Sequence, residues 1–337
     1  MRKMVDFFGR ISEKRAVETV KEAERKFIYE LVDDARAPLT KFAKKLRVSK
    51  DTAHYTLTKL QKSHVVVHIS PIVDLTRFGF RTYHAFFVTN DDNKQKRTEF
   101  LEYLKKHAHT KSLMEYTDRW EIEWILIAKN VQEFDSIIMK TVTKFSDVII
   151  EKMKLLVIKG YKSTTVAARH IPELKNPKSY EYDNADLKLL NFLHEDGRMS
   201  SHAIAEQLKI SPNAVRYRIK KLIETNIIRS FSATINMSAL GYHVYTVGLI
   251  LKSLSEEQEA KMREFFRNKR FIIRAVKVLG HWDVLLTIVS DSIKHFHTTV
   301  KEIEDAFSDV IINYESLIAY EEHVFKYIPD VVMKEKK

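Results

Sequence analysis

Two short segments of the sequence gather side chains that could recognise nucleic acid. In the segment after Pro212, Asn213 can hydrogen-bond the edge of an adenine and Arg216 the edge of a guanine. The other cations nearby would contact phosphates, which position a protein on a duplex without reading its sequence. Tyr217 could pack against the sugar backbone or against the first helix of its own unit. The candidate DNA contacts of this segment are Ser211, Asn213, Arg216, Tyr217, Arg218, Lys220 and Lys221.

The second segment lies in the first half of the chain. Its candidate DNA contacts are Ser49, Lys50, His54, Tyr55 and Lys59. When Ser49 is aligned with Ser211, His54 occupies the position that corresponds to Arg216, so this segment lacks the arginine that suits guanine best. We therefore interpret the later segment as a specific reader and the earlier one as a mostly electrostatic helper.

The net charge of the chain supports contacts with phosphates. The whole chain carries a formal charge of +12, and residues 35–68 and 197–229 hold this entire excess. A solvated protein surface normally mixes charges of both signs. Cations concentrated in two short units are typical of nucleic-acid binding, where each neutralised phosphate releases counterions. A merely soluble basic surface is the simpler alternative.

The elements that would carry these side chains are three short helices followed by a strand. Residues 185–195 have helical spacing of leucines, Ser200 or Ser201 can begin a second helix, and Ser211 followed by Pro212 is a strong start for a third. The third helix would bury Val215, Ile219, Leu222 and Ile223. A tight turn before the last helix predicts a helix-turn-helix, and residues 227–233 fit a wing strand. In the earlier segment, residues 65–69 would be the corresponding strand.

A repeat with one constant offset runs through the chain. The shift that places Trp120 on Trp282 also places Phe145–Ile150 on the identical segment Phe307–Ile312. A register that is kept over most of each half predicts two copies of one module. The predicted domains are an N-terminal helix (1–23), a winged helix-turn-helix (24–70), an α/β domain (71–161), a linker with Pro172 and Pro177 (162–182), a second winged helix-turn-helix (183–235) and a second α/β domain (236–337).

The second half of each module has the pattern of a small α/β sheet. Residues 243–251, 271–279, 282–289 and 309–320 read as strands, and residues 255–268 and 293–307 read as helices. The order βαββαβ predicts a ferredoxin-like domain, so the fold class is α+β with two winged helix-turn-helix domains alternating with two ferredoxin-like domains. Such a sheet has helices on one face only. The bare face predicts pairing of module with module or of chain with chain.

The turn between the two middle strands contains Gly280 and His281. A two-residue hairpin needs a positive φ, which glycine adopts freely. Asp283 follows this turn, and its carboxylate could bind the amine of a ligand or could only cap the turn. The first module has Asp118 and Glu121 at the corresponding positions, so its turn should differ.

Several of these residues, in this order, resemble the Lrp/AsnC transcription regulators of bacteria and archaea. The resemblance rests on Asp186-x-x-x-Leu190, Asp196-Gly197-Arg198-Met199-Ser200, Ala205, Ser211, Val215-x-x-Arg218-Ile219-x-x-Leu222, Ile227-Ile228, Leu240-Gly241 and Gly280-His281-Trp282-Asp283. It implies a DNA-binding regulator whose sheet domains dimerise, and therefore a homo-oligomer, most simply a dimer. It also implies a small-molecule effector such as an amino acid, bound near Gly280, His281 and Asp283.

Other functional classes find less support in the sequence. The chain has no cysteine, so disulfides and thiolate zinc sites are excluded, and we expect no metal, no cofactor and no catalytic residue. No apolar run is long enough to span a membrane, and we expect a cytoplasmic protein that is not an enzyme. The main alternative is a tetrapyrrole-modifying enzyme that resembles the sirohaem decarboxylases, which share this architecture. The histidines that keep this alternative open include His243, His281, His295 and His297.

Overall fold

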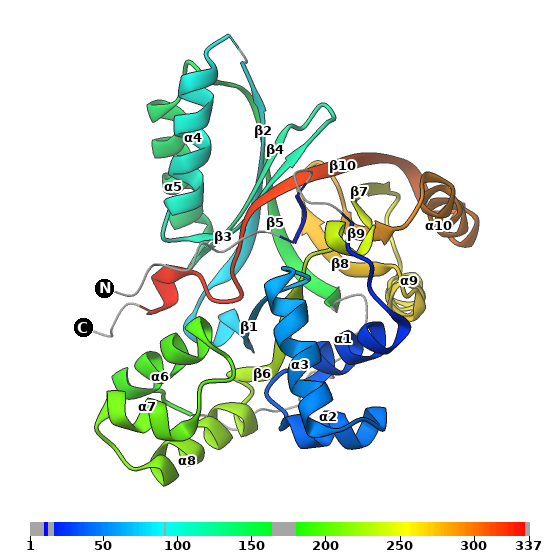
Figure 1. Cartoon of the computed structure of the whole chain (residues 1–337). Helices are drawn as coiled ribbons and strands as arrows, with labels where there is room; N and C mark the ends of the chain where they lie inside the picture. Colours follow the sequence, from blue (N-terminus) through cyan, green and yellow to red (C-terminus); the bar gives the residue numbers. More distant parts are fainter. Residues whose placement is uncertain (1–9, 13–16, 91, 164–179, 334–337) are drawn as a thin grey trace.

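The computed structural model describes residues 10–12, 17–90, 92–163 and 180–333 (Figure 1). Its α-helices are α1 (Glu22–Asp34), α2 (Leu39–Leu46), α3 (Lys50–Lys62), α4 (Lys94–Lys106), α5 (Val131–Lys144), α6 (Asn184–Glu195), α7 (Ser201–Leu208), α8 (Pro212–Glu224), α9 (Glu256–Asn268) and α10 (Ile293–Ala306). Its strands are β1 (Val66–Val73), β2 (Arg81–Thr89), β3 (Thr110–Tyr116), β4 (Ile122–Ala128), β5 (Ile149–Ser163), β6 (Ile228–Ile235), β7 (His243–Leu251), β8 (Ile272–Leu279), β9 (Val284–Ser290) and β10 (Ile311–Phe325). Three short 3₁₀ helices, η1 (Leu75–Phe78), η2 (Ser238–Leu240) and η3 (Asp330–Met333), complete the described elements.

Two groups of three helices form compact helical units. The first helical unit is α1–α3 and the second is α6–α8. Local capping explains where the second unit's helices begin: Asp183 and Asp186 form a capping box at α6, Ser200 caps α7 and Ser211 caps α8. The predicted inward residues of α8 are buried except Ile223, whose side chain is 42% exposed. The spacing made Ile223 look like a core residue, but it lies at the edge of the apolar stripe.

Eight strands close into one barrel in the order β10-β3-β4-β2-β5-β8-β9-β7. The strands β3-β4-β2-β5 and β8-β9-β7-β10 each have the order of a ferredoxin-like sheet, and all neighbours are antiparallel. The two sheets join at two seams, where β5 pairs with β8 and β10 pairs with β3. Each sheet therefore covers the bare face of the other within a single chain.

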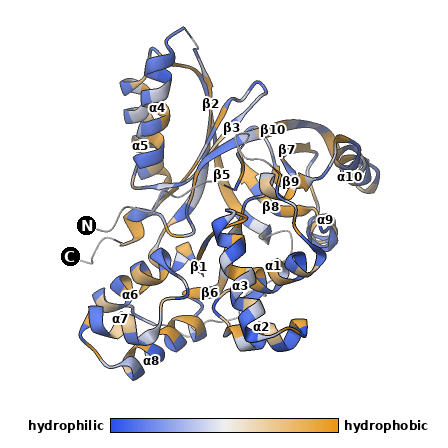
Figure 2. Cartoon of the chain, viewed as in Figure 1, coloured by the Kyte–Doolittle hydropathy of each residue, from blue (hydrophilic) through white to orange (hydrophobic). Residues whose placement is uncertain are grey.

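Helices pack on the outside of the barrel, while a separate core fills its interior. Figure 1 shows α4 and α5 beside one sheet and α9 and α10 beside the other. Trp124 belongs to the cluster under α4 and α5, and Phe266 to the cluster under α9 and α10. Phe86, Trp120 and Trp282 belong to a third cluster that continues from the interior into the helical units. In Figure 2 hydrophilic and hydrophobic residues alternate along the helices, as expected for helices with one apolar face.

The predicted wing strands pair with each other. β1 and β6 form an antiparallel two-stranded sheet, with Ile69 opposite Ala233. Figure 1 shows this sheet between the barrel and the two helical units. Because β1 follows α3 and β6 follows α8, this pairing fixes the two helical units relative to one another.

The N-terminal segment does not follow the predicted helix. Residues 10–12 and 17–21 carry no helix, and α1 begins at Glu22. Ile11 is buried instead, and Ser12 forms a β-bridge with Glu321 of β10. The remainder of the predicted helix, and most of the predicted linker with Pro172 and Pro177, lies outside the described residues. Within those residues, no helix is both long and apolar enough to cross a membrane.

Candidate nucleic-acid interface and barrel interior

The two third helices, α3 and α8, present similar faces to solvent. Ser49 Oγ accepts a hydrogen bond from Thr52 N (3.0 Å), and Ser211 Oγ accepts one from Ala214 N (3.1 Å), so both predicted caps form. Tyr55 and Tyr217 occupy matching positions and are 68% and 62% exposed. Tyr217 therefore does not pack against the first helix of its unit. Instead, Lys221 Nζ lies 5.8 Å from the centre of its ring.

The predicted base-reading residues of α8 lie together on its exposed face. Arg216 donates a hydrogen bond to Asn213 Oδ1, which orients both side chains. A hollow of about 380 Å³ lies beside Arg216. Its walls are formed by Arg36, Ser201, Arg216, Ile219, Lys220, Ile223 and Glu224. This hollow joins α8 to the first helical unit through Arg36.

Two predicted DNA contacts, Arg218 and Lys59, form ion pairs with acidic residues of their own helical unit. Arg218 Nη1 lies 2.8 Å from Asp186 Oδ1 and 2.9 Å from Asp183 Oδ2, so it ties α8 to the start of α6. Lys59 Nζ lies 2.6 Å from Glu24 Oε1 and ties α3 to α1. Both residues therefore orient the third helices, and their role as phosphate contacts stays a prediction. The acids lie on other helices, far away in sequence, so spacing along α3 or α8 could not reveal them.

Other cations on these units remain available to an anionic partner. Lys220 and Lys221 only approach Glu224 at 3.6 and 3.8 Å. His54 is exposed on α3. Among the described residues, several exposed cations have no ion-pair partner: Lys44, Arg47, Lys50 and Lys62 in the first unit, and Lys209 in the second. The first unit thus presents more uncompensated charge, which its sequence also indicates.

Two arginines fasten the helical units to each other. Arg36 donates from Nη1 to the carbonyl of Gly197 (2.6 Å) and from Nη2 to that of Met199 (2.9 Å). Arg198 donates in return to the carbonyl of Ala35. These two arginines correspond to one another in the repeat, so each unit holds the other by the same residue. Their charge was counted toward DNA binding in the sequence, and both guanidinium groups also form this contact between the units.

The turn at Gly280 packs against the seam between the two sheets. Gly280 has φ +152°, and a Cβ there would lie 2.4 Å from Leu155 Cδ2 and 2.8 Å from the Lys154 carbonyl oxygen. Asp283 Oδ2 accepts a hydrogen bond from Leu251 N (2.7 Å), and exposed His281 contacts Glu315 at 2.9 Å. Asp283 therefore has the capping contact that we considered beside ligand binding.

In the corresponding turn of the first module, a glutamate makes the capping contact that Asp283 makes in the second. Glu121 Oε2 accepts a hydrogen bond from Thr89 N at 3.1 Å. Thr89 corresponds to Leu251 in the repeat, so both acids cap the end of an equivalent strand. Asp118, which replaces the glycine, has no positive φ and accepts a hydrogen bond from Ile318 N at 2.6 Å. The turn differs, as its sequence predicts.

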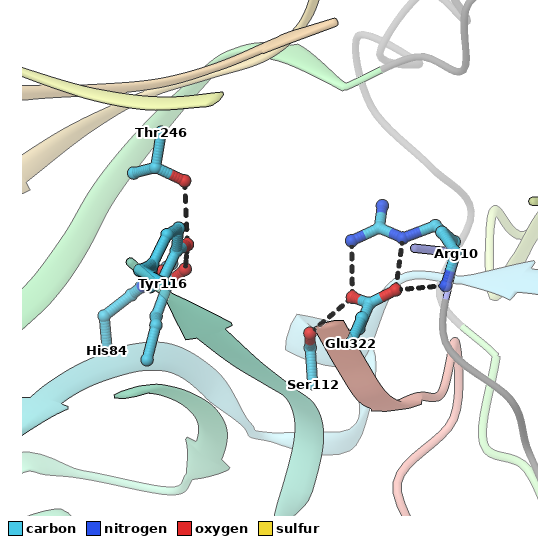
Figure 3. Close-up of polar contacts among 7 residues, drawn as sticks. Arg10, His84, Ser112, Tyr116, Thr246 and Glu322 are labelled. Atoms are coloured by element: carbon cyan, nitrogen blue, oxygen red, sulfur yellow. Dashed lines mark hydrogen bonds and ion pairs between the residues drawn. The ribbon is translucent and has the colours of Figure 1, made fainter. Parts of the chain in front are cut away.

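A polar network crosses the barrel interior, and sequence patterns gave no sign of it. Arg274 Nη2 lies 2.6 Å from His84 Nε2, and His84 Nδ1 lies 2.5 Å from Glu123 Oε1. Because arginine can only donate, His84 accepts at Nε2 and donates from Nδ1, and is neutral. Glu123 also accepts from the Tyr116 hydroxyl, which in turn lies 2.8 Å from Thr246 Oγ1 (Figure 3). Burial, followed by the Arg274 charge, lowers the pKa of His84 to about 4.

A second polar contact in the interior holds the N-terminal segment. Arg10 forms a bidentate ion pair with Glu322, with Nε to Oε2 at 3.0 Å and Nη2 to Oε1 at 2.8 Å, and Ser112 also donates to this carboxylate (Figure 3).

The histidines singled out in the sequence take no part in these interior contacts: His243 and His297 are exposed, and His295 pairs with Asp291. The described residues contain no group of three His, Asp or Glu side chains suited to holding a metal ion.

Comparison with known proteins identifies the family. A family model described as "Winged helix-turn-helix DNA-binding" matches residues 182–229. The leucine-responsive regulatory protein of Rhizobium meliloti is 32% identical over 125 residues, which cover 36% of this chain and 79% of that protein. The transcriptional regulator Ptr1 of Methanocaldococcus jannaschii is 37% identical over 112 residues, covering 32% of this chain and 73% of that protein. The chain belongs to the Lrp/AsnC family of helix-turn-helix transcription regulators.

A solved structure shares the architecture of nearly the whole chain. The siroheme decarboxylase NirDL matches with a TM-score of 0.61 at 13% sequence identity, covering 91% of this chain and 94% of that one. At this identity the likeness concerns the fold alone. It nevertheless overturns our expectation that the chain is not an enzyme, because an enzyme is built on the same whole-chain fold. The winged helix-turn-helix motifs in the sequence do not exclude catalysis.

Proposed function

We propose that this chain is a tandemly duplicated Lrp/AsnC-type regulator that binds double-stranded DNA in a sequence-specific way through α8 and α3. The observation that carries this proposal is the pair of matching helix faces. Each begins at a capping serine and exposes a tyrosine, and cations on its unit lack partners. A recognition helix of this kind enters the major groove with its N-terminal residues against the bases.

The duplication is part of the proposal. It is supported by the single offset of the sequence repeat and by the recurrence of one order of elements, from α1 to β5 and from α6 to β10. The β1–β6 pairing and the reciprocal contacts of Arg36 and Arg198 join the helical units as two subunits would be joined. One chain would then present two unlike readers to two adjacent half-sites.

Within this proposal, α8 reads bases and α3 contributes mainly charge. Arg216 and Asn213 would contact base edges, with Ser211, Lys220 and Lys221 toward the backbone. Tyr217 and Tyr55 are exposed enough to pack against sugars. In the first unit, Ser49, Lys50 and His54 would contact the backbone, while Lys59 and Arg218 would act by orienting the helices.

Effector control, oligomeric state and location complete the proposal. An amino acid or similar small molecule would bind near Gly280, His281 and Asp283, where the Asp283 side chain is exposed. The two sheets already face each other inside one chain, so a dimer of this chain would have to form through another surface. We place the protein in the cytoplasm, with the DNA that it would regulate.

The proposal is tested by selecting genomic DNA fragments that the purified chain retains. Enrichment of a common motif, with affinity that falls steeply as salt rises, is the expected result, because phosphate contacts release counterions. Equal retention of all fragments, or an affinity that does not respond to salt, would overturn it. Repeating the selection with candidate amino acids tests the effector separately.

The shared architecture with NirDL supports a second candidate function, a tetrapyrrole-modifying enzyme. A solved complex of NirDL contains an iron-uroporphyrin III analogue. The interior network around His84, Glu123 and Arg274 would supply polar groups for such a ligand. Titration of the chain with iron-uroporphyrin III, followed by visible absorption, tests this candidate. A spectrum equal to that of free ligand plus protein would count against it.

A further inference from the structure

One end of the barrel holds more buried positive charge than its carboxylates neutralise. Arg10 pairs with Glu322, and Arg229 Nη2 lies 2.7 Å from Asp74 Oδ2. Two cations remain, Lys111 of β3 and Arg274 of β8. One further carboxylate, Glu123, is linked to Arg274 through His84. When Lys111 is protonated, this cluster of four cations and three carboxylates therefore carries an excess of one positive charge.

Lys111 is the cation without a partner. Its ammonium group has no hydrogen bond or ion pair with any described residue, although the side chain is only partly exposed. Burial, together with the charges of Arg274, Arg10 and Arg229, lowers the pKa of Lys111 to about 7. An unpaired ammonium among three guanidinium groups is unfavourable for the folded chain unless an anion joins it.

Arg274 also has hydrogen-bond donors that lack an acceptor among the described residues. Among the described residues, only its Nη2 atom has a hydrogen-bond acceptor, and that acceptor is a neutral histidine. The residue is intermediate in exposure, and its remaining guanidinium nitrogens have no acceptor among the described residues. A guanidinium presents its donors in a fork that matches the two oxygens of a carboxylate.

The topology brings these two cations toward one another across the barrel. β3 and β8 lie on opposite walls of the closed ring of strands. A register shift between Thr110 and Ser112 interrupts the alternation of β3 at Lys111. Thr110 contacts Trp124 on the side covered by helices, whereas Ser112 contacts Glu322 inside. Lys111 therefore lies where β3 turns its side chains toward the interior.

The second module does not repeat this cluster. In the repeat, Lys111 corresponds to Ile273, Glu123 to Leu285 and Tyr116 to Val278. A purely structural need of the barrel would apply to both halves, because their strands pair in the same way. The charged residues are instead confined to one end, so the described part of the chain has one such site and no symmetric copy.

We propose that this end of the barrel is a binding site for one small organic monoanion, whose carboxylate contacts the Lys111 ammonium and the Arg274 guanidinium. One negative charge matches the excess of the cluster. The buried apolar side chains of Met114 on β3 and Phe86 on β2 would receive an apolar tail. The site is distinct from the Gly280 turn and does not depend on DNA binding.

Lys111→Ile tests the site with the residue that the chain itself has at the corresponding position. Thermal unfolding and calorimetric titration of the full chain are measured with butyrate, with inorganic phosphate and with the neutral analogue butyramide. For the unmodified chain we expect saturable binding of butyrate and a rise in Tm, no effect of butyramide and weaker binding of phosphate. Lys111→Ile should raise Tm without ligand, since it removes an unpaired cation, and should abolish the butyrate effect.

The controls separate this site from nonspecific effects of charge or folding. Lys140→Ile, which removes an exposed lysine on α5, should retain the butyrate response. The proposal is overturned if butyrate does not bind, if its effect survives in Lys111→Ile, if that variant is less stable without ligand, or if phosphate binds more tightly. DNA binding is measured on the same preparations, so its failure would be recognised independently.

Discussion

The hydroxyl groups of Tyr116 and Thr246 lie 2.8 Å apart and join the two halves of the barrel across its interior. Tyr116 uses its only hydroxyl proton on Glu123, so Thr246 must be the donor in this pair. The hydrogen bonds thus converge from Thr246 and from Arg274 on one buried carboxylate. The strands that contribute to this arrangement are β2, β3, β4, β7 and β8.

A double-mutant cycle should detect the coupling between these hydroxyls. Tyr116→Phe removes a hydrogen bond to a buried carboxylate and should lower the free energy of unfolding by about 1.5–3 kcal/mol. Thr246→Val should cost about 1 kcal/mol, and the double variant should cost less than the sum, because the two residues share one network. Urea denaturation of the four proteins measures this. Strict additivity would contradict the link.

Acid should destabilise the chain through histidines that are buried in the neutral form. Burial and the Arg274 charge lower the pKa of His84 to about 4, and burial with nearby His68 and Lys326 lowers that of His194 to about 3. Unfolding restores pKa values near 6.5, so between about pH 6.5 and 4 the unfolded chain binds more protons and stability falls as the pH falls.

The urea midpoint, measured at a series of pH values, checks this prediction. His84→Gln can still donate and accept hydrogen bonds but does not titrate, so its midpoint should vary less over the same range. A variant with the same pH dependence as the unmodified chain would show that His84 does not contribute.

Gly280 should tolerate no side chain. A Cβ would meet Leu155 and the Lys154 carbonyl oxygen, and the φ of +152° adds strain, so Gly280→Ala should cost about 1–3 kcal/mol of stability. Gly160→Ala is the matched control, because nothing lies within 4 Å of a Cβ there and its φ is not in the positive range. Equal Tm values for the two variants would contradict the close approach at the seam.

The reciprocal arginines should matter to stability more than exposed ion pairs do. Arg36→Met removes two charged hydrogen bonds to carbonyl groups and should cost about 1.5–3 kcal/mol for each bond that is not replaced by water. Lys41→Met, which removes the exposed pair with Asp34, should cost about 0–1 kcal/mol. Denaturant midpoints measure both. Similar costs would mean that the contact between the units is weak.

Arg216 should determine sequence preference on DNA. Arg216→Ala should lower affinity for a selected site by about 1–3 kcal/mol, with little change on random DNA, because a base contact is lost while phosphate contacts remain. His54→Ala, at the matching position of α3, should change both affinities little. Gel-shift titrations on the two DNAs measure this. A loss for Arg216→Ala that is equal on both would assign it to phosphates.

The sequence predicted the individual elements well and their long-range pairing poorly. The start of α8 depends on Ser211 and Pro212, which are neighbours, so local chemistry was sufficient. Closure of the barrel depends on β5 meeting β8 and β10 meeting β3, and no local pattern encodes these partners. The sequence predicted that each sheet needs a partner on its bare face. It did not predict that the edge strands of the two sheets would also pair and close a barrel.

In the candidate site, too, local features were predictable from the sequence and long-range contacts were not. Exposure of Tyr217 and capping by Ser211 follow from helix geometry, whereas the partner of Arg218 is a carboxylate on another helix. His84 stands in a strand of mostly apolar residues and looks like an ordinary core residue. Only the fold brings it to Arg274, which is 190 positions away. The net charge of the chain therefore indicated an anionic partner but did not reveal which cations form contacts inside the protein.

The pairing of β1 with β6 has a consequence for how the two helical units respond to dilution. In a homodimer, two such units meet by association, and at low concentration they separate according to mass action. Here one polypeptide supplies both strands, so the local concentration of each for the other is set by the chain and not by the amount of protein. A cell could keep very few copies of this chain, and each copy would still hold both units together.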